Sequence, residues 1–185
     1  MKCGIKWVLL LLFILPCLIS SQLLQKIEGK ENQADLCNKL KPCELLTQTD
    51  AERILGQPVR LSDNRSERRG EVRQCSCTYT GIAKDPASDQ DINLYFSFEQ
   101  KESSPSAEQA QQVMESTKSE NAHDTIIKAL PGIGDEAFQL GEESNICFIM
   151  ARKGGVILRL QIKQATEKSS LEELKNFASK LAKRL

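Results

Sequence analysis

Apolar residues recur along this chain with two different periods. Alternation with period two runs through "EVRQCSCTYTG" (71–81), "INLYFSFE" (92–99) and "VILRLQIK" (156–163). Successive side chains of a strand point to opposite faces, so alternation predicts half-buried strands. The segments "EAFQLG" (136–141) and "NICFIMAR" (145–152) add shorter strands, and Lys153-Gly154-Gly155 predicts a hairpin turn.

Three other segments have helical spacing. Residues 48–55 follow Thr47, which has Asp50 three positions on, and stop at Gly56. A second helix follows Ser106, with an apolar face of Ala107, Ala110, Val113, Met114 and Thr117. A third starts after Ser169 or Ser170, and its apolar stripe is Leu171, Leu174, Phe177, Ala178, Leu181 and Leu185.

The links between the strands decide the fold class. Most are of hairpin length, whereas parallel neighbours need a crossover of a dozen residues or more. We therefore predict an α+β fold, an antiparallel β-sheet of five or six strands packed with helices. The segment "LSDNRSERRGEV" (61–72) is expected to be a charged turn in water, and residues 121–130 a connector.

The first 21 residues have the pattern of a secretory signal peptide. Lys2 and Lys6 precede an apolar run at 7–19, and Ser20-Ser21 offers small residues for cleavage. The run is shorter than the ~20 apolar residues of a membrane-spanning helix. Cys17 raises the alternative of a lipoprotein, which is disfavoured because Pro16 stands where a small residue is required.

The organisation expected is a signal peptide at 1–21, a polar spacer at 22–42 and a single α+β domain at 43–185. The whole chain has 25 Lys+Arg and 25 Asp+Glu. This balance lacks the excess of basic residues that is typical of proteins that bind nucleic acid.

Five cysteines lie beyond the leader: Cys37, Cys43, Cys75, Cys77 and Cys147. In an exported chain they predict disulfides, although spacing alone does not choose the pairing. Because five is odd, at least one has no internal partner. Cys147 alternates with apolar residues and is expected to be a buried free thiol.

Catalytic, cofactor and metal sites are not predicted. His123 is the only histidine and lies in the polar segment "NAHDT", so a two-histidine metal site is ruled out. A redox enzyme would show Cys-x-x-Cys more naturally than the Cys-x-Cys present here. An enzyme using Cys75, Cys77 and His123 remains the alternative.

The segment "PGIGDEAF" (131–138) suggests an active site but is interpreted as a structural turn. Asp135 and Glu136 are adjacent at the start of a strand, so their carboxylates diverge and do not share one reacting centre. Gly132 and Gly134 precede an extended segment, whereas a phosphate-binding glycine loop precedes a helix.

Several short motifs occur in an order that resembles a known family. They are "CELLT" (43–47), "ILGQPV" (54–59), "CTY" (77–79), "PGIGDEAF" (131–138) and "ARKGGVILRLQI" (151–162), before a closing amphipathic helix. The pattern is similar to a domain-of-unknown-function family of exported bacterial proteins and lipoproteins, of the actinobacterial lipoprotein type, with a PsbP-like α/β sandwich. The resemblance implies a fold and a compartment, and no chemistry.

The resemblance also bears on the cysteines. It supplies the pair Cys43 and Cys77, whereas Cys37 and Cys75 are additional to the family pattern. If the first helix packs against the strand of Cys75 and Cys77, a Cys43–Cys77 bridge follows, and Cys37 could then reach Cys75 on the same strand face.

These observations lead to one functional prediction with two alternatives. We expect an exported, periplasmic or extracellular, non-catalytic domain that binds a protein partner or a small ligand in the cell envelope. The alternatives are the thiol enzyme described above and a structural envelope protein tethered to a membrane by its N-terminus. The sequence does not indicate the oligomeric state.

Overall fold

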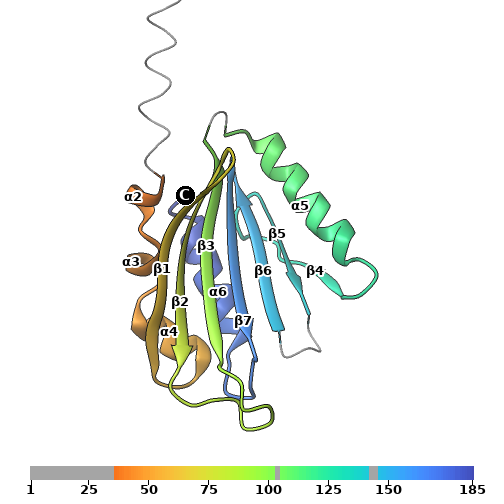
Figure 1. Cartoon of the computed structure of the whole chain (residues 1–185). Coiled ribbons are helices and arrows are strands. Elements are labelled where there is room, and N and C mark those ends of the chain that lie inside the picture. Colours follow the sequence, from red (N-terminus) through yellow and green to blue (C-terminus); the bar gives the residue numbers. More distant parts are fainter. Residues whose placement is uncertain (1–35, 103–104, 142–145) are drawn as a thin grey trace, which may run out of the picture. The chain divides into compact units, whose positions relative to one another are not determined.

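Seven antiparallel strands form a single sheet in the order β1-β2-β3-β7-β6-β5-β4 (Figure 1). The computed structural model describes residues 36–102, 105–141 and 146–185. The strands are β1 (Val59–Arg69), β2 (Val72–Gly81), β3 (Asn93–Lys101), β4 (Ile127–Ala129), β5 (Glu136–Leu140), β6 (Ile146–Lys153) and β7 (Val156–Lys163). The predicted α+β class and antiparallel pairing are confirmed.

The three longest described helices begin where the sequence places their caps, whereas the two short helices before them were not predicted. The described helices are α2 (Leu36–Leu40), α3 (Pro42–Leu45), α4 (Gln48–Leu55), α5 (Ala107–Asn121) and α6 (Leu171–Ala182). The side chains of Thr47, Ser106 and Ser170 each accept a hydrogen bond from the backbone N–H three residues later. Gly56 ends α4 in the left-handed conformation.

The predicted number of strands, five or six, was too low. Residues 61–69, expected to be a charged turn, belong to β1, which pairs with β2 along its whole length. β4 lies inside the segment expected to be a connector. This part of β1 was missed because residues 62–69 are polar on both faces and show no apolar alternation, so only the pairing with β2 reveals it.

The N-terminal assignments fall partly outside the described residues. The signal peptide at 1–21 and residues 22–35 of the spacer are not described. One compact unit spans Leu36–Leu185, so residues 36–42 of the expected spacer form α2 and lead into α3. None of the described helices has the length and apolar character needed to cross a membrane.

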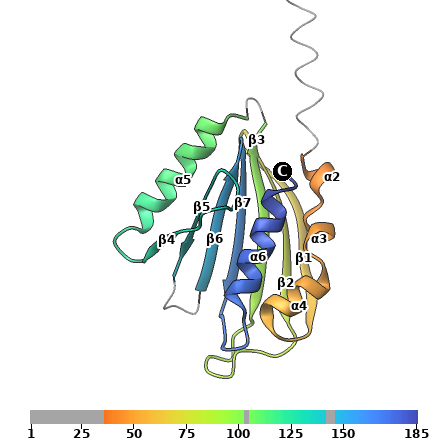
Figure 2. The same ribbon diagram turned by 180° about the vertical axis from the view of Figure 1, so that it is seen from behind.

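The main core lies between the sheet and the helices α4 and α6. Phe96 and Phe98 of β3 are fully buried there, and the rings of Phe96 and Phe177 of α6 meet edge to face at 5.8 Å. Figure 2 shows α6 in front of the sheet, and Figure 1 shows it behind. This layer is continuous from β2 to β6.

Helix α5 packs on the opposite face of the sheet. Its buried Ala110 and Met114 join a second apolar cluster with Phe138 of β5, Met150 of β6 and Ile157 of β7. On β3 the side chains of Tyr95, Ser97 and Glu99 share this face, since they alternate with the core residues. α5 contacts β6 and β7 and leaves the β1–β3 part of its face without a helix among the described residues.

Candidate functional site: a groove between α5 and the sheet

Two disulfides bind the N-terminal helices to β2. Cys37 of α2 is bonded to Cys75 with the Cα atoms 5.5 Å apart, and Cys43 of α3 is bonded to Cys77 with the Cα atoms 5.3 Å apart. Cys75 and Cys77 face the same side because they are two residues apart in a strand. The resemblance supplies the Cys43–Cys77 pair, whereas Cys37 and Cys75 are additional to the family pattern and are joined as their shared strand face allows. The two disulfides are consistent with an oxidising, exported location.

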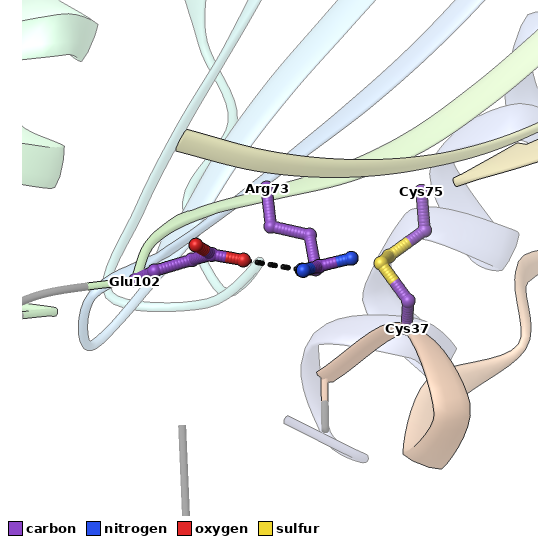
Figure 3. The surroundings of a disulfide bond; sticks show 4 residues. All are labelled: Cys37, Arg73, Cys75 and Glu102. Carbon is purple, nitrogen blue, oxygen red and sulfur yellow. Dashed lines mark hydrogen bonds and ion pairs between the residues drawn. A yellow bond between two sulfur atoms is a disulfide. The ribbon is translucent and has the colours of Figure 1, made fainter. Parts of the chain in front are cut away.

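An ion-pair cluster adjoins the Cys37–Cys75 bridge. Figure 3 shows Arg73 beside the disulfide, with its Nε donating to Glu102 Oε1 at 2.5 Å. Arg68 of β1 pairs with the other Glu102 oxygen at 2.9 Å. Because Glu102 already holds two arginines, the cluster ties β1, β2 and the end of β3 together and has a structural role.

The sequence candidates for thiol chemistry do not converge. Cys75 and Cys77 lie in disulfides on β2, whereas His123 lies in the turn between α5 and β4. β2 and β4 are on opposite sides of the sheet order, and Figures 1 and 2 both show that turn far from α2 and α3. Cys147 is buried in β6 and belongs to neither disulfide. No group of three potential metal ligands occurs in the described ranges.

The glycine-rich turn before β5 is hydrogen-bonded to the β6–β7 hairpin. Asp135 Oδ2 accepts a hydrogen bond from the Gly154 N–H at 2.8 Å, and Asp135 Oδ1 pairs with Lys153 Nζ at 2.9 Å. The Gly154 N–H and then Lys153 lower the pKa of Asp135. The Asp135 N–H also donates to the Arg152 carbonyl at 2.8 Å.

The neighbouring Glu136 has a different partner. It pairs with Lys118 of α5, whose Nζ also lies 5.6 Å from the centre of the Phe138 ring. Hydrogen bonding to Glu136 is the main reason that the pKa of Lys118 is raised. The closest partners of Asp135 are in the β6–β7 hairpin and that of Glu136 is in α5, and Arg152 of β6 lies between the two carboxylates, 3.4 Å from Asp135 and 3.9 Å from Glu136.

A groove of about 420 Å³ runs between α5 and the ends of β2, β3 and β7. Its apolar surface comes from Val72, Ala110, Val113 and Ile157. Polar side chains line the rest, among them Gln100, Gln109, Gln112, Ser106 and Ser116. This combination of apolar surface and a few hydrogen-bonding groups is typical of ligand sites.

Both charged residues of the groove have partners. Glu99 accepts a hydrogen bond from Gln74 at 3.0 Å and pairs with Arg159 at 3.1 Å, and Lys101 pairs with Glu71 at 2.8 Å. The Gln109 side-chain carbonyl oxygen is buried and has no hydrogen-bond partner among the described residues. The groove therefore presents mainly neutral polar groups, and the side chains of Gln100, Gln112 and Ser116 can accept hydrogen bonds from an N–H or O–H donor.

The start of α5 sits close to the β6–β7 hairpin. A Cβ atom on Gly155 would lie 3.0 Å from the Pro105 carbonyl carbon and 3.1 Å from the Ser106 nitrogen. The absence of a side chain at Gly155 lets the chain enter α5 at this point. Gly155 also lines the groove, so this contact helps to set its width.

The sequence did not identify this groove. Val113 was expected to face the core with Ala110 and Met114, but it is 39% exposed and faces the groove, whereas Met114 is fully buried. Val72 is also exposed, at 37%. In the sequence, the groove is indicated only by Val113 among the glutamines of α5 and by Val72 at the start of β2. This pattern becomes informative once the helix is placed on the sheet.

No family model matches the chain, and neither the curated proteins nor the solved structures include a match.

Proposed function

We propose that this chain is an exported, non-catalytic binding domain whose ligand site is the groove between α5 and the sheet. The observation that carries the proposal is the groove itself, with an apolar surface and neutral hydrogen-bonding groups. The ligand class that fits is an uncharged molecule or peptide segment with an apolar part and an N–H or O–H donor. A charged ligand would have to disrupt the ion pairs of Glu99 or Lys101.

Export rests on two features. The basic, apolar and small-residue pattern of residues 1–21 is typical of a cleaved leader, and the two disulfides suit an oxidising compartment. Mass spectrometry of the mature protein tests this step. An N-terminus near Gln22 without a lipid supports export by cleavage, whereas an acylated Cys17 would favour the membrane-tethered alternative.

The fold family proposed is that of PsbP-like sandwiches. The antiparallel sheet with helices on both faces supports this proposal, as do the motifs quoted from the sequence. An experimental structure superimposed on a PsbP-like domain would test it through the strand order.

Binding can be tested with three probes of equal size and different charge: benzamide, benzoate and benzamidine. Methyl NMR should show that benzamide shifts the signals of Val72, Val113 and Ile157 more than either charged probe does. Val113→Gln, which removes an exposed apolar group, should weaken this response. Leu61→Gln is the matched control, since Leu61 is 48% exposed on β1.

Two results would contradict the proposal. The first is a benzamide response outside the groove that Val113→Gln does not change. The second is measurable turnover of a substrate that is abolished by changing one polar residue. Reactive thiols at Cys75 or Cys77 in the native protein would favour the alternative, a thiol enzyme.

A further inference from the structure

β1 is a long edge strand, and among the described residues no strand pairs with its outer side. It stands at one end of the sheet order and has 11 residues. Directly after β2 the Ile82 N–H donates to the Pro58 carbonyl, before β1, and at the end of β2 the Gly81 N–H donates to the Ile92 carbonyl, before β3. Even-numbered residues of β2 therefore direct their backbone groups to β1, and odd-numbered residues to β3.

The register then shows which β1 groups point outward. Asp63, Arg65, Glu67 and Arg69 stand opposite even-numbered β2 residues and bond to them. The alternating residues Asn64, Ser66 and Arg68 direct their N–H and C=O groups away from the sheet. All three are exposed, and none of these backbone groups has a hydrogen-bond partner within the described ranges.

Acidic and basic side chains alternate along the face of β1 that is opposite to α6. Arg65 pairs with Asp63 at 2.6 Å and with Glu67 at 3.3 Å, and Arg69 pairs with Glu67 at 3.0 Å. Along the strand the charges are negative at Asp63, positive at Arg65, negative at Glu67 and positive at Arg69. Such an edge repels most foreign strands, because directly opposed like charges destabilise a strand pair.

A second copy of β1 matches this pattern. An antiparallel pair with its two-fold axis at Ser66 places Arg65 opposite Glu67 of the second copy, and Asp63 opposite Arg69. An axis at Arg65 or at Glu67 places like charges opposite each other. An axis at Asn64 keeps only the Asp63–Arg65 pairing and runs into the bulge between Leu61 and Asp63.

We infer that this chain forms a two-fold dimer in which two β1 strands pair antiparallel about Ser66, which gives a sheet continuous across both copies. The backbone of Ser66 hydrogen-bonds to the backbone of Ser66 in the second copy, and the backbone of Asn64 hydrogen-bonds to that of Arg68 in the second copy. These bonds use the backbone groups that point away from each sheet. The charged residues then occupy the non-hydrogen-bonded positions, where side chains of paired strands are closest. The interface is small and polar, so the dimer is weak and dissociates on dilution.

Sedimentation velocity of the protein with both disulfides formed tests this inference. Wild type should pass from monomer to dimer as the concentration rises, and added salt should weaken the dimer. Glu67→Arg changes two attractive pairs into repulsive ones because of the symmetry, and should raise the dimer dissociation constant at least about tenfold. Arg65→Glu should have the same effect.

The double variant Arg65→Glu with Glu67→Arg restores opposite charges across the axis and should recover dimerisation. Ser66→Pro removes one outward N–H without disturbing the bonds to β2, and should abolish the dimer. Thermal unfolding shows that each variant is folded. A wild type that stays monomeric up to about 1 mM overturns the inference. So does a dimer that Glu67→Arg leaves intact, or association beyond the dimer.

Discussion

Cys43 of α3 and Cys77 of β2 are joined by a disulfide across a sequence separation of 34 residues. The Cys37–Cys75 bridge spans 38 residues and meets the same strand two positions away. α2 and α3 are only 5 and 4 residues long. Helices this short are not stable by themselves, so the disulfides determine where they lie.

Removing the Cys43–Cys77 bridge should lower the stability substantially. The chain-entropy model gives a loss of about 3–4 kcal/mol in the free energy of unfolding for Cys43→Ser with Cys77→Ser. Guanidinium denaturation measures it. Cys147→Ala is the control, since it removes a buried sulfur but no cross-link, and should cost only about 1 kcal/mol. Equal losses in both variants would contradict the stabilising role of the bridge.

Two glycines of the "PGIG" turn should differ in their tolerance of a side chain. Gly132 and Gly134 both have positive φ, 83° and 64°. A Cβ on Gly134 would also collide with the Arg152 carbonyl oxygen, whereas nothing lies within 4 Å at Gly132. Gly134→Ala should therefore cost about 1–3 kcal/mol more than Gly132→Ala in chemical denaturation. Equal costs would show that the turn adapts.

Asp135 should contribute stability that is lost in acid. Its folded pKa is below the ordinary value, so the contribution is present above the unfolded pKa and disappears as pH falls through the folded one. The side chain is 34% exposed, which limits the effect to under about 1 kcal/mol. Asp135→Asn should flatten the loss of stability below about pH 4.

The control for this experiment is Asp91→Asn, a change at an exposed position in the loop before β3. It should leave the acid profile unchanged. If Asp135→Asn also reproduces the wild-type profile, the Gly154 contact does not contribute to stability.

Neighbouring residues of α5 should respond very differently to truncation. Met114 is fully buried against the second apolar cluster, so Met114→Ala should cost about 2–5 kcal/mol. Val113 faces the groove, and Val113→Ala should change the stability by less than about 0.5 kcal/mol. Thermal or chemical unfolding of the two variants checks the orientation of α5. A larger loss for Val113→Ala would mean that the helix is rotated.

Local features of the sequence predicted a good part of the fold. The caps at Thr47, Ser106 and Ser170 act within one helical turn, so residue identity at two nearby positions was enough to place three helices. The alternation in β2, β3 and β7 reflects one buried face, which is visible in sequence. An antiparallel sheet followed from the short links between strands.

Contacts between distant segments decided the remaining features. Beyond Leu61, β1 has no apolar face, so its strand conformation there depends on its hydrogen bonds to β2. The pairing of the four cysteines in the two disulfides depends on where α2 and α3 cross β2. The groove exists because α5 covers only part of its side of the sheet, and this offset is set by packing of Met114 and by the Lys118–Glu136 pair. Residue periodicity describes which face of a helix is apolar, but the position of that helix on the sheet results from long-range packing.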